Sequence, residues 1–204
     1  LPYYHQALIG SFPSVYQLLP RSRHKPLVWD ADTDKPVKDF LNPELWQKMK
    51  WGLSGEDEKT DAVLKSLMPD VASMTERRKI AREYQSAALK RARLFQMAMD
   101  SPAQTPENFE MFLVAGDNRE TPAIASIDKS SGEFEILQYE LGDETVTRAS
   151  ALLDERVGQK WEPRVVSPLN WSSTMFIHGK HRTITSGPIF EDNVLYWLLE
   201  DPRN

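Results

Sequence analysis

The stretch Tyr139-Glu-Leu-Gly-Asp-Glu-Thr-Val146 places a glycine, an acid and a small hydroxyl residue directly after a segment that predicts a β-strand. Gly142 permits a tight backbone bend, and Thr145 can hydrogen-bond the loop. Asp143 is then expected on a short loop at the end of a strand, where a carboxylate can orient a histidine. By composition alone the same run is also typical of a plain turn, because Asp and Gly favour turns.

The second half of the chain predicts alternating strands and helices around this stretch. Strands are expected at 109–115, 123–127, 134–139 and 174–177, with a further β-prone pair at 165–166. A helix or turn is expected to start at residue 150, and a final helix covers 191–199. Alternation of this kind indicates an α/β fold.

The first half of the chain predicts mostly helices. Apolar residues recur at helical spacing over 75–99, which predicts a long amphipathic helix with one packing face. Asn42 and Pro43 predict the start of another helix, as N-cap and first-turn residue. A short strand is expected at 27–29, followed by a turn over 30–34. The composition changes near residue 104.

His181 follows the last expected strand and precedes the final helix. A histidine on that loop is placed to act as a general base, with Asp143 as the acid that orients it. We therefore expect the two side chains within hydrogen-bonding distance. His178 competes for the same role, and a surface or structural histidine is the alternative reading. His5 and His24 precede the acid, and nothing in the sequence places them near it.

The composition excludes several function classes. The 204 residues carry a net charge of −5, with 40% hydrophobic and 27% charged residues, an ordinary globular balance. The main basic run lies on the predicted long helix as a solvated face, so no nucleic-acid partner is expected. No apolar run is long enough to predict a transmembrane segment. Cysteine is absent, which excludes disulfides and leaves the compartment open, with a cytoplasmic location slightly favoured.

Metal and cofactor motifs are also missing. Asp30, Asp32 and Asp34 alternate like the start of a calcium loop, but the glycine and glutamate that such a loop needs do not follow. No histidine pair has zinc spacing with a third ligand. No glycine-rich loop suits a phosphate. We therefore expect neither a metal nor a cofactor.

Four segments, in this order, resemble the C-terminal part of the lecithin:cholesterol acyltransferase-like α/β-hydrolases. They are Phe12-Pro-Ser-Val-Tyr-Gln-Leu-Leu-Pro20, Phe112-Leu-Val-Ala-Gly116 with Thr121-Pro122, Gly142-Asp-Glu-Thr-Val146, and His181 ahead of the final helix. The resemblance implies that Asp143 and His181 are the acid and the base of a catalytic triad. It implies hydrolysis or acyl transfer on lipid or other carboxylic esters through a serine acyl-enzyme, without a cofactor.

The resemblance also divides the chain into three parts. Residues 1–20 are expected to connect to core strands that precede this chain, 21–104 to form a helical cap or lid, and 105–204 to complete the α/β-hydrolase sheet. Because the chain starts at Leu1 rather than Met, we expect a processed product or a fragment. A sheet without its first strands should expose an edge and an apolar face. A missing N-terminal segment, a partner chain or a second copy in a homodimer would cover them.

The chain departs from the family pattern in ways that leave its function open. Glu144 replaces the family's second glycine, and Thr147 replaces a proline. No Gly-x-Ser-x-Gly is present, so the nucleophile is missing; Ser14, Ser172 and Ser173 are candidates outside any such motif. The chain is therefore interpreted as the C-terminal portion of a serine hydrolase or acyltransferase. The alternative is a non-catalytic interaction module or a decayed hydrolase-like domain.

Overall fold

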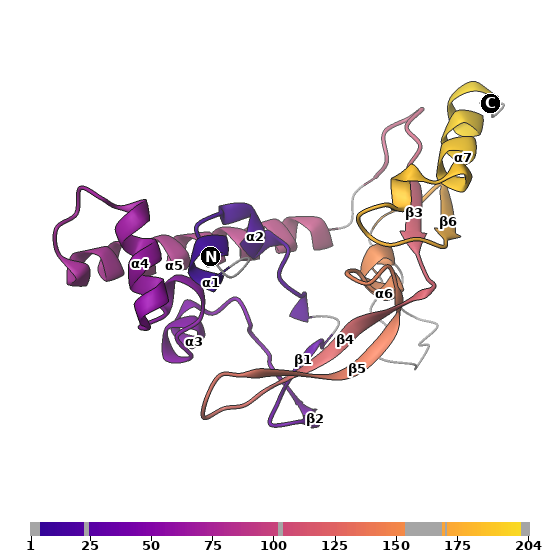
Figure 1. Cartoon of the computed structure of the whole chain (residues 1–204). Helices are drawn as coiled ribbons and strands as arrows, with labels where there is room; N and C mark the ends of the chain where they lie inside the picture. The colour runs from indigo at the N-terminus through magenta and orange to yellow at the C-terminus, as the bar shows by residue number, and fades with distance from the viewer. Residues whose placement is uncertain (1–4, 23–24, 102–103, 154–168, 170, 201–204) are drawn as a thin grey trace.

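The computed structural model describes residues 5–22, 25–101, 104–153, 169 and 171–200 (Figure 1). The helices are α1 (Gln6–Ile9), α2 (Pro13–Gln17), α3 (Pro43–Lys48), η2 (Gly52–Ser54), α4 (Glu58–Leu67), α5 (Met74–Asp100), α6 (Arg148–Leu152), η3 (Ile184–Ser186) and α7 (Pro188–Leu199). The strands are β1 (Leu27–Trp29), β2 (Asp32–Pro36), β3 (Phe112–Gly116), β4 (Arg119–Ile127), β5 (Phe134–Gly142) and β6 (Ser173–Ile177).

In the described residues the fold is mixed α/β, with one four-stranded sheet and one two-stranded sheet. One sheet has the strand order β2-β1-β4-β5, in which β1 and β4 are parallel and the other neighbours antiparallel. The other sheet is the parallel pair β3–β6, whose register runs from Phe112 opposite Ser173 to Gly116 opposite Ile177. Strand β6, which ends at Ile177, therefore leads directly into the loop that carries His181.

The β4–β5 hairpin links the two regions of the molecule. Ile127 pairs with Phe134 next to the turn, and Arg119 pairs with Gly142 at the other end. The turn is held by the Asp128 carboxylate, which accepts hydrogen bonds from main-chain N–H groups of the two serines that follow it. Figure 1 shows the hairpin running from beneath the helices of the first half to the β3–β6 pair. Gly142 thus lies near β3, and Phe134 lies near the helices.

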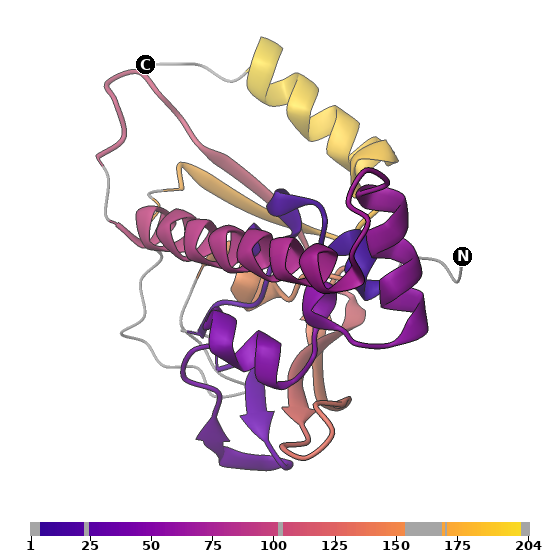
Figure 2. The ribbon, with the colours of Figure 1, turned by 90° about the vertical axis from the view of Figure 1, so that its left-hand side faces the viewer.

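Helix α5 organises the first half of the chain. Ser73 caps it by accepting a hydrogen bond from the Glu76 N–H. Its apolar stripe buries Ala88, Leu89 and Ala92, and α2, α3 and α4 pack along it. Figure 2 shows α5 spanning the helical side of the molecule, with α3 and α4 beside it.

An aromatic cluster lies between these helices and the four-stranded sheet. Phe40, Trp46 and Trp51 are all buried, with ring centroids 5.4 to 5.8 Å apart. Tyr16 packs on Trp46 from α2, and Phe134 packs on Trp51 from β5. Tilted and edge-on arrangements of this kind suit the charge distribution of aromatic rings.

Two features of the first half differ from the sequence prediction. Asp32–Pro36 forms strand β2, where a turn was expected. Strand β1 pairs with β4, so the four-stranded sheet crosses the boundary expected at residue 104. The region 21–104 is thus mostly helical but contributes two strands to the sheet of the second half. The β-prone pair at 165–166 lies outside the described residues.

Helix α7 ends the described chain with apolar side chains in water. None of its residues is buried, and Leu198 and Leu199 are 64% and 76% exposed. Trp197 stacks on Phe112 of β3, with ring centroids 4.6 Å apart. This exposed apolar surface belongs to a helix, whereas the expectation from the sequence concerned an edge and a face of the sheet. Among the described residues, no helix combines the length and apolar character that crossing a membrane requires.

Candidate active site

Asp143 occupies a closed loop directly after β5. Its side chain is buried, and its Oδ1 accepts hydrogen bonds from the N–H groups of Thr145 at 3.0 Å and Val146 at 2.7 Å. The Asp143 N–H donates in turn to the Val146 carbonyl at 3.2 Å. One carboxylate oxygen therefore folds the loop, and this leaves Oδ2 available for another group.

The His181 ring binds that second oxygen, Oδ2. Its Nδ1 lies 2.9 Å from Asp143 Oδ2, within the hydrogen-bonding range expected from the sequence. The His181 main-chain N–H also donates to the Asp143 carbonyl at 2.8 Å. Because a carboxylate only accepts, Nδ1 is the donor in this contact, and in the neutral ring Nε2 then keeps its lone pair. The ring is 48% exposed, and no described residue hydrogen-bonds Nε2.

The charge state of Asp143 suits this arrangement. Burial raises the pKa of the carboxyl, but hydrogen bonds from the Val146 N–H, the His181 ring and the Thr145 N–H together hold it below its usual value. Asp143 is therefore ionised at neutral pH. An ionised carboxylate can stabilise an imidazolium that forms at His181.

Two glycines make room for the acid. A Cβ on Gly116, at the end of β3, would lie 2.6 Å from the Asp143 Cβ. A Cβ on Gly142 would lie 2.3 Å from the Val146 carbonyl oxygen and 2.6 Å from the Thr121 Oγ1. All three distances are shorter than such atoms can approach, so the loop packs in this position only because these two residues lack side chains.

Thr121 and Glu144 complete the loop. The Thr121 side chain is fully buried; its Oγ1 accepts the Glu144 N–H at 2.9 Å and donates to the Arg119 carbonyl at 3.1 Å. Glu144 has φ of +80°, a left-handed conformation that favours glycine. Its carboxylate lies 3.2 Å from Lys180 and 4.0 Å from Arg119. These contacts tie the acid loop to the segment before His181.

The loop before His181 is anchored by β6 and β3. These strands run parallel, so their C-terminal ends meet at one edge of the sheet. Just beyond that edge, the Gly179 N–H donates to the Asn118 side-chain oxygen at 3.2 Å. The C-terminal ends of three strands, β3, β5 and β6, therefore meet at the Asp143–His181 pair.

The other histidines do not join this site. His178 is exposed and has no hydrogen bond to a described residue. His5 caps α1 by accepting the Ala7 N–H and lies 3.6 Å from Asp57. His24 lies outside the described residues. The choice between His178 and His181 as the partner of Asp143 is settled by position in favour of His181.

The serine candidates lie elsewhere in the fold. Ser172 and Ser173 stand at the start of β6, and the Ser172 Oγ accepts the Met111 N–H at 3.0 Å. His181 follows the opposite end of that strand, about 13 Å further on at strand spacing. Ser14 lies on α2 in the helical half. Among the described residues, none of these hydroxyls hydrogen-bonds the histidine.

The acidic alternation near β1 has structural partners. The Asp30 side chain accepts the Lys129 N–H, and Asp32 forms an ion pair with Lys35. In the described part of the chain, no group of three or more His, Cys, Asp or Glu residues is arranged to hold a metal ion.

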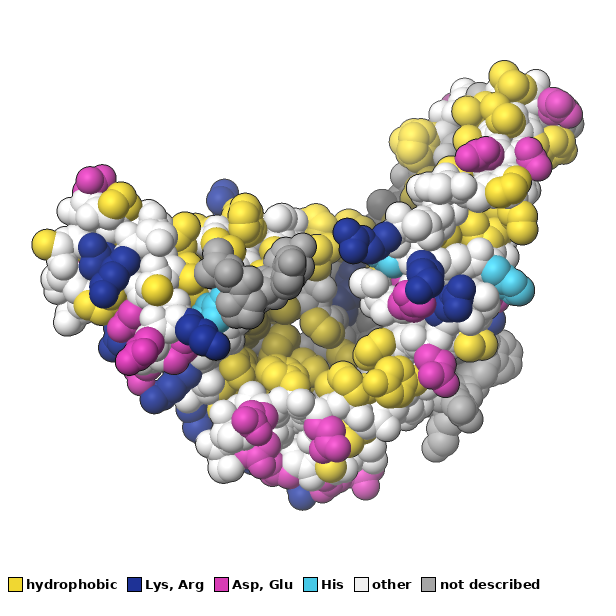
Figure 3. Space-filling model, in the orientation of Figure 1, with side chains coloured by type: hydrophobic (Ala, Val, Ile, Leu, Met, Phe, Trp, Pro, Cys, Tyr) yellow, Lys and Arg dark blue, Asp and Glu magenta, His cyan; other side chains and the backbone are white. Residues whose placement is uncertain are grey.

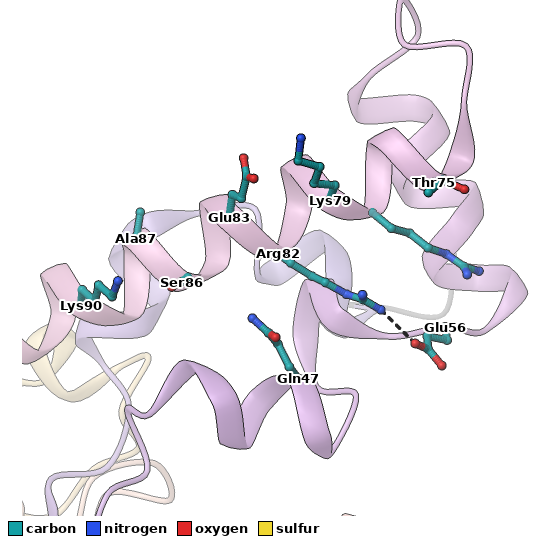
Figure 4. A pocket seen from close by; sticks show the side chains of 10 residues that line it. Gln47, Glu56, Thr75, Lys79, Arg82, Glu83, Ser86, Ala87 and Lys90 are labelled. Carbon is teal, nitrogen blue, oxygen red and sulfur yellow. Dashed lines mark hydrogen bonds and ion pairs between the residues drawn. The ribbon is translucent and has the colours of Figure 1, made fainter.

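A groove in the helical half differs in character from the Asp143–His181 site. It is an open groove of about 800 Å³ along α5 (Figure 4). Arg82 pairs there with Glu56, and Arg78 pairs with Asp61. Its two guanidinium groups are thus already neutralised by carboxylates on neighbouring segments. The groove carries no histidine among its described lining residues.

No protein-family model, curated protein or solved structure matches this chain. We therefore infer the function from the geometry. The sequence predicted Asp143 and His181 as site residues, but it did not single out Gly116, Thr121 and Lys180. The first two stood in the segments that carry the family resemblance, which was the available signal; Lys180 had none.

Proposed function

We propose that this chain supplies the acid and the base of a serine esterase or acyltransferase of the α/β-hydrolase type, acting on lipid or other carboxylic esters. The observation that carries the proposal is the 2.9 Å contact between His181 Nδ1 and Asp143 Oδ2, with Nε2 facing away from the acid and free of described partners. An imidazole held in this tautomer by a buried carboxylate is prepared to accept a proton from a hydroxyl.

The proposed reaction uses His181 twice. Nε2 takes the proton of a serine hydroxyl while the serine oxygen attacks the ester carbonyl, and Asp143 stabilises the resulting imidazolium. The imidazolium then gives this proton to the departing alcohol, which leaves an acyl-serine. Water or an acceptor alcohol attacks the acyl group in the second half, with Nε2 again taking and returning a proton. The acceptor decides between hydrolysis and acyl transfer.

The serine is proposed to come from polypeptide outside these 204 residues. The chain contains no Gly-x-Ser-x-Gly, and no described hydroxyl binds His181 Nε2. The parallel pair β3–β6 and the exposed helix α7 support this assignment, because parallel strands are normally covered on both faces. Further strands beside this pair would place a nucleophile turn at the same edge as the histidine.

A non-catalytic interaction module is the second candidate. The backbone of Glu144 favours it: a glycine would suit φ of +80° better, and the resemblance places a glycine there. A loop that has no catalytic role would tolerate this replacement of glycine by glutamate. In this case the exposed faces serve association only, and Asp143 with His181 holds the loops together.

A serine-directed probe separates the two candidates. The tagged chain is expressed in its own cells, treated with a fluorophosphonate and recovered through the tag. We expect the label on a serine outside these 204 residues, either in the same polypeptide or in another polypeptide that is recovered with it. His181→Ala and Asp143→Asn should lose the label, while His178→Ala, an exposed neighbour outside the site, should keep it. Equal labelling of all variants, or no labelling of any, would reject the enzymatic function.

A further inference from the structure

An apolar cavity lies between the helices of the first half and the four-stranded sheet. Its volume is about 400 Å³, within the range of small-molecule sites. Figure 3 shows the opening as a hollow between the N-terminal helices and the β4–β5 hairpin, with hydrophobic side chains on its floor. The residues that matter for its chemistry are Val15, Tyr16, Phe40, Trp46, Trp51 and Phe134.

The hydroxyl and indole N–H groups of the aromatic walls already have hydrogen-bond partners. The Tyr16 hydroxyl donates to the Gly10 carbonyl at 2.8 Å, and burial raises the pKa of that hydroxyl. The Trp46 and Trp51 indole N–H groups donate to main-chain carbonyls at 2.7 and 2.8 Å. No charged side chain stands among the described lining residues. A polar ligand would lose its hydrogen bonds to water and gain few in return.

The walls are also held in place without a ligand. The aromatic rings pack against one another, and the indole hydrogen bonds fix their orientation. Walls fixed in this way keep the cavity open, and an apolar ligand that enters it displaces water that finds few polar partners there. Because one side opens to solvent, a ligand can bury an apolar part and leave a polar end in water.

We propose that this cavity binds the hydrocarbon chain of a single-chain amphiphile, such as a fatty acid, with the polar end at the opening. The cavity is separate from the Asp143–His181 pair. Phe134 lines it at one end of β5, and Gly142 stands at the other end of that nine-residue strand, about 27 Å away at strand spacing. The inference therefore stands whether or not the chain belongs to an esterase.

The test uses ω-bromododecanoic acid below its micelle concentration, because bromine quenches tryptophan fluorescence on contact. We expect saturable quenching by the full chain, with unbrominated dodecanoic acid as a competitor. Val15→Phe fills the cavity and should weaken binding by about tenfold or more. Leu18→Phe is the matched control. Leu18 lies three residues after Val15, is 83% exposed and does not line the cavity.

The outcomes separate this site from other apolar surfaces. Quenching that is unchanged in Val15→Phe means that the acid binds elsewhere, for example on α7, and overturns the proposal. Equal loss in Val15→Phe and Leu18→Phe overturns it as well. Leu19→Phe, a second lining position, replaces Val15→Phe if circular dichroism shows that the latter is misfolded. His181→Ala should bind like the wild type, so the failure of the esterase function leaves this result unaffected.

Discussion

The Glu144 carboxylate lies 3.2 Å from the Lys180 ammonium, so an ion pair joins the residue after the acid to the residue before the histidine. The two side chains are 42% and 57% exposed, and water screens much of their attraction. Glu144 also holds φ of +80°, which opposes a residue with a Cβ. Its side chain therefore stabilises the site weakly while its backbone strains it.

Replacing Glu144 by glycine should raise the free energy of unfolding by about 0–2 kcal/mol. Relief of a left-handed conformation gains about 1–2 kcal/mol, while losing an exposed ion pair costs about 0–1 kcal/mol. Urea denaturation measures the change. Glu144→Gln keeps the strained backbone and removes the charge, so it should be slightly less stable than the wild type. A Glu144→Gly variant less stable than Glu144→Gln would contradict the strain.

Asp143→Asn should move the proton on the His181 ring. The N–H groups of Thr145 and Val146 hold the oxygen position of the side chain, so the new amide N–H₂ faces Nδ1. Nδ1 then has to accept, and the proton shifts to Nε2. Nitrogen-15 NMR of the ring reports the change of tautomer, and His178→Ala should leave the His181 signals in place. An Asp143→Asn spectrum like that of the wild type would contradict the geometry. Under the proposed function, this variant should also lower esterase or acyltransferase activity by about 10⁴-fold.

Gly116→Ala should destabilise the chain and displace the acid. The added methyl group would lie 2.6 Å from the Asp143 Cβ, and overpacking of this kind costs about 1–3 kcal/mol. Thermal unfolding measures the loss, and the His181 ring signals should change with it. Gly187→Ala is the control, because a Cβ there has no neighbour within 4 Å. Equal effects of the two variants would show that Gly116 is not packed on the acid.

The stabilising effect of the Asp128 carboxylate should be lost in acid. The Ser130 hydroxyl, followed by the Ser131 and Ser130 N–H groups, lowers the pKa of Asp128 from 3.8 to about 2. A pKa lowered by folding stabilises the folded state above 3.8, and this contribution is lost as the pH falls toward 2. The melting temperature of the wild type should therefore exceed that of Asp128→Asn at about pH 5, and the difference should shrink toward pH 2. A difference independent of pH would rule out this contribution.

Local patterns predicted the elements that depend on neighbouring residues. The helix expected at 75–99 extends from Met74 to Asp100, because its apolar spacing and its cap are both local. Asn42 caps α3 as expected, by accepting the Glu44 N–H. The strand at Asp32–Pro36 was missed because its residues show no apolar alternation. The parallel pairing of β1 with β4 was missed because it joins segments far apart in the sequence.

The site was predictable to the level of its two polar side chains. Their order, acid then histidine after successive strands, matched the family resemblance, and the structure brings them to 2.9 Å. The left-handed conformation of Glu144 carries no sequence signal, since glutamate rarely adopts it. The role of Thr121 depends on a hydroxyl buried by the next strand, which only the folded hairpin creates.

Helix α7 has a consequence for the life of the chain in a cell. Chaperones and proteases recognise apolar segments that folding leaves in water, and Leu195, Leu198 and Leu199 all remain there. The exposed helix is therefore also an aggregation liability, and the isolated chain should lose solubility as its concentration rises.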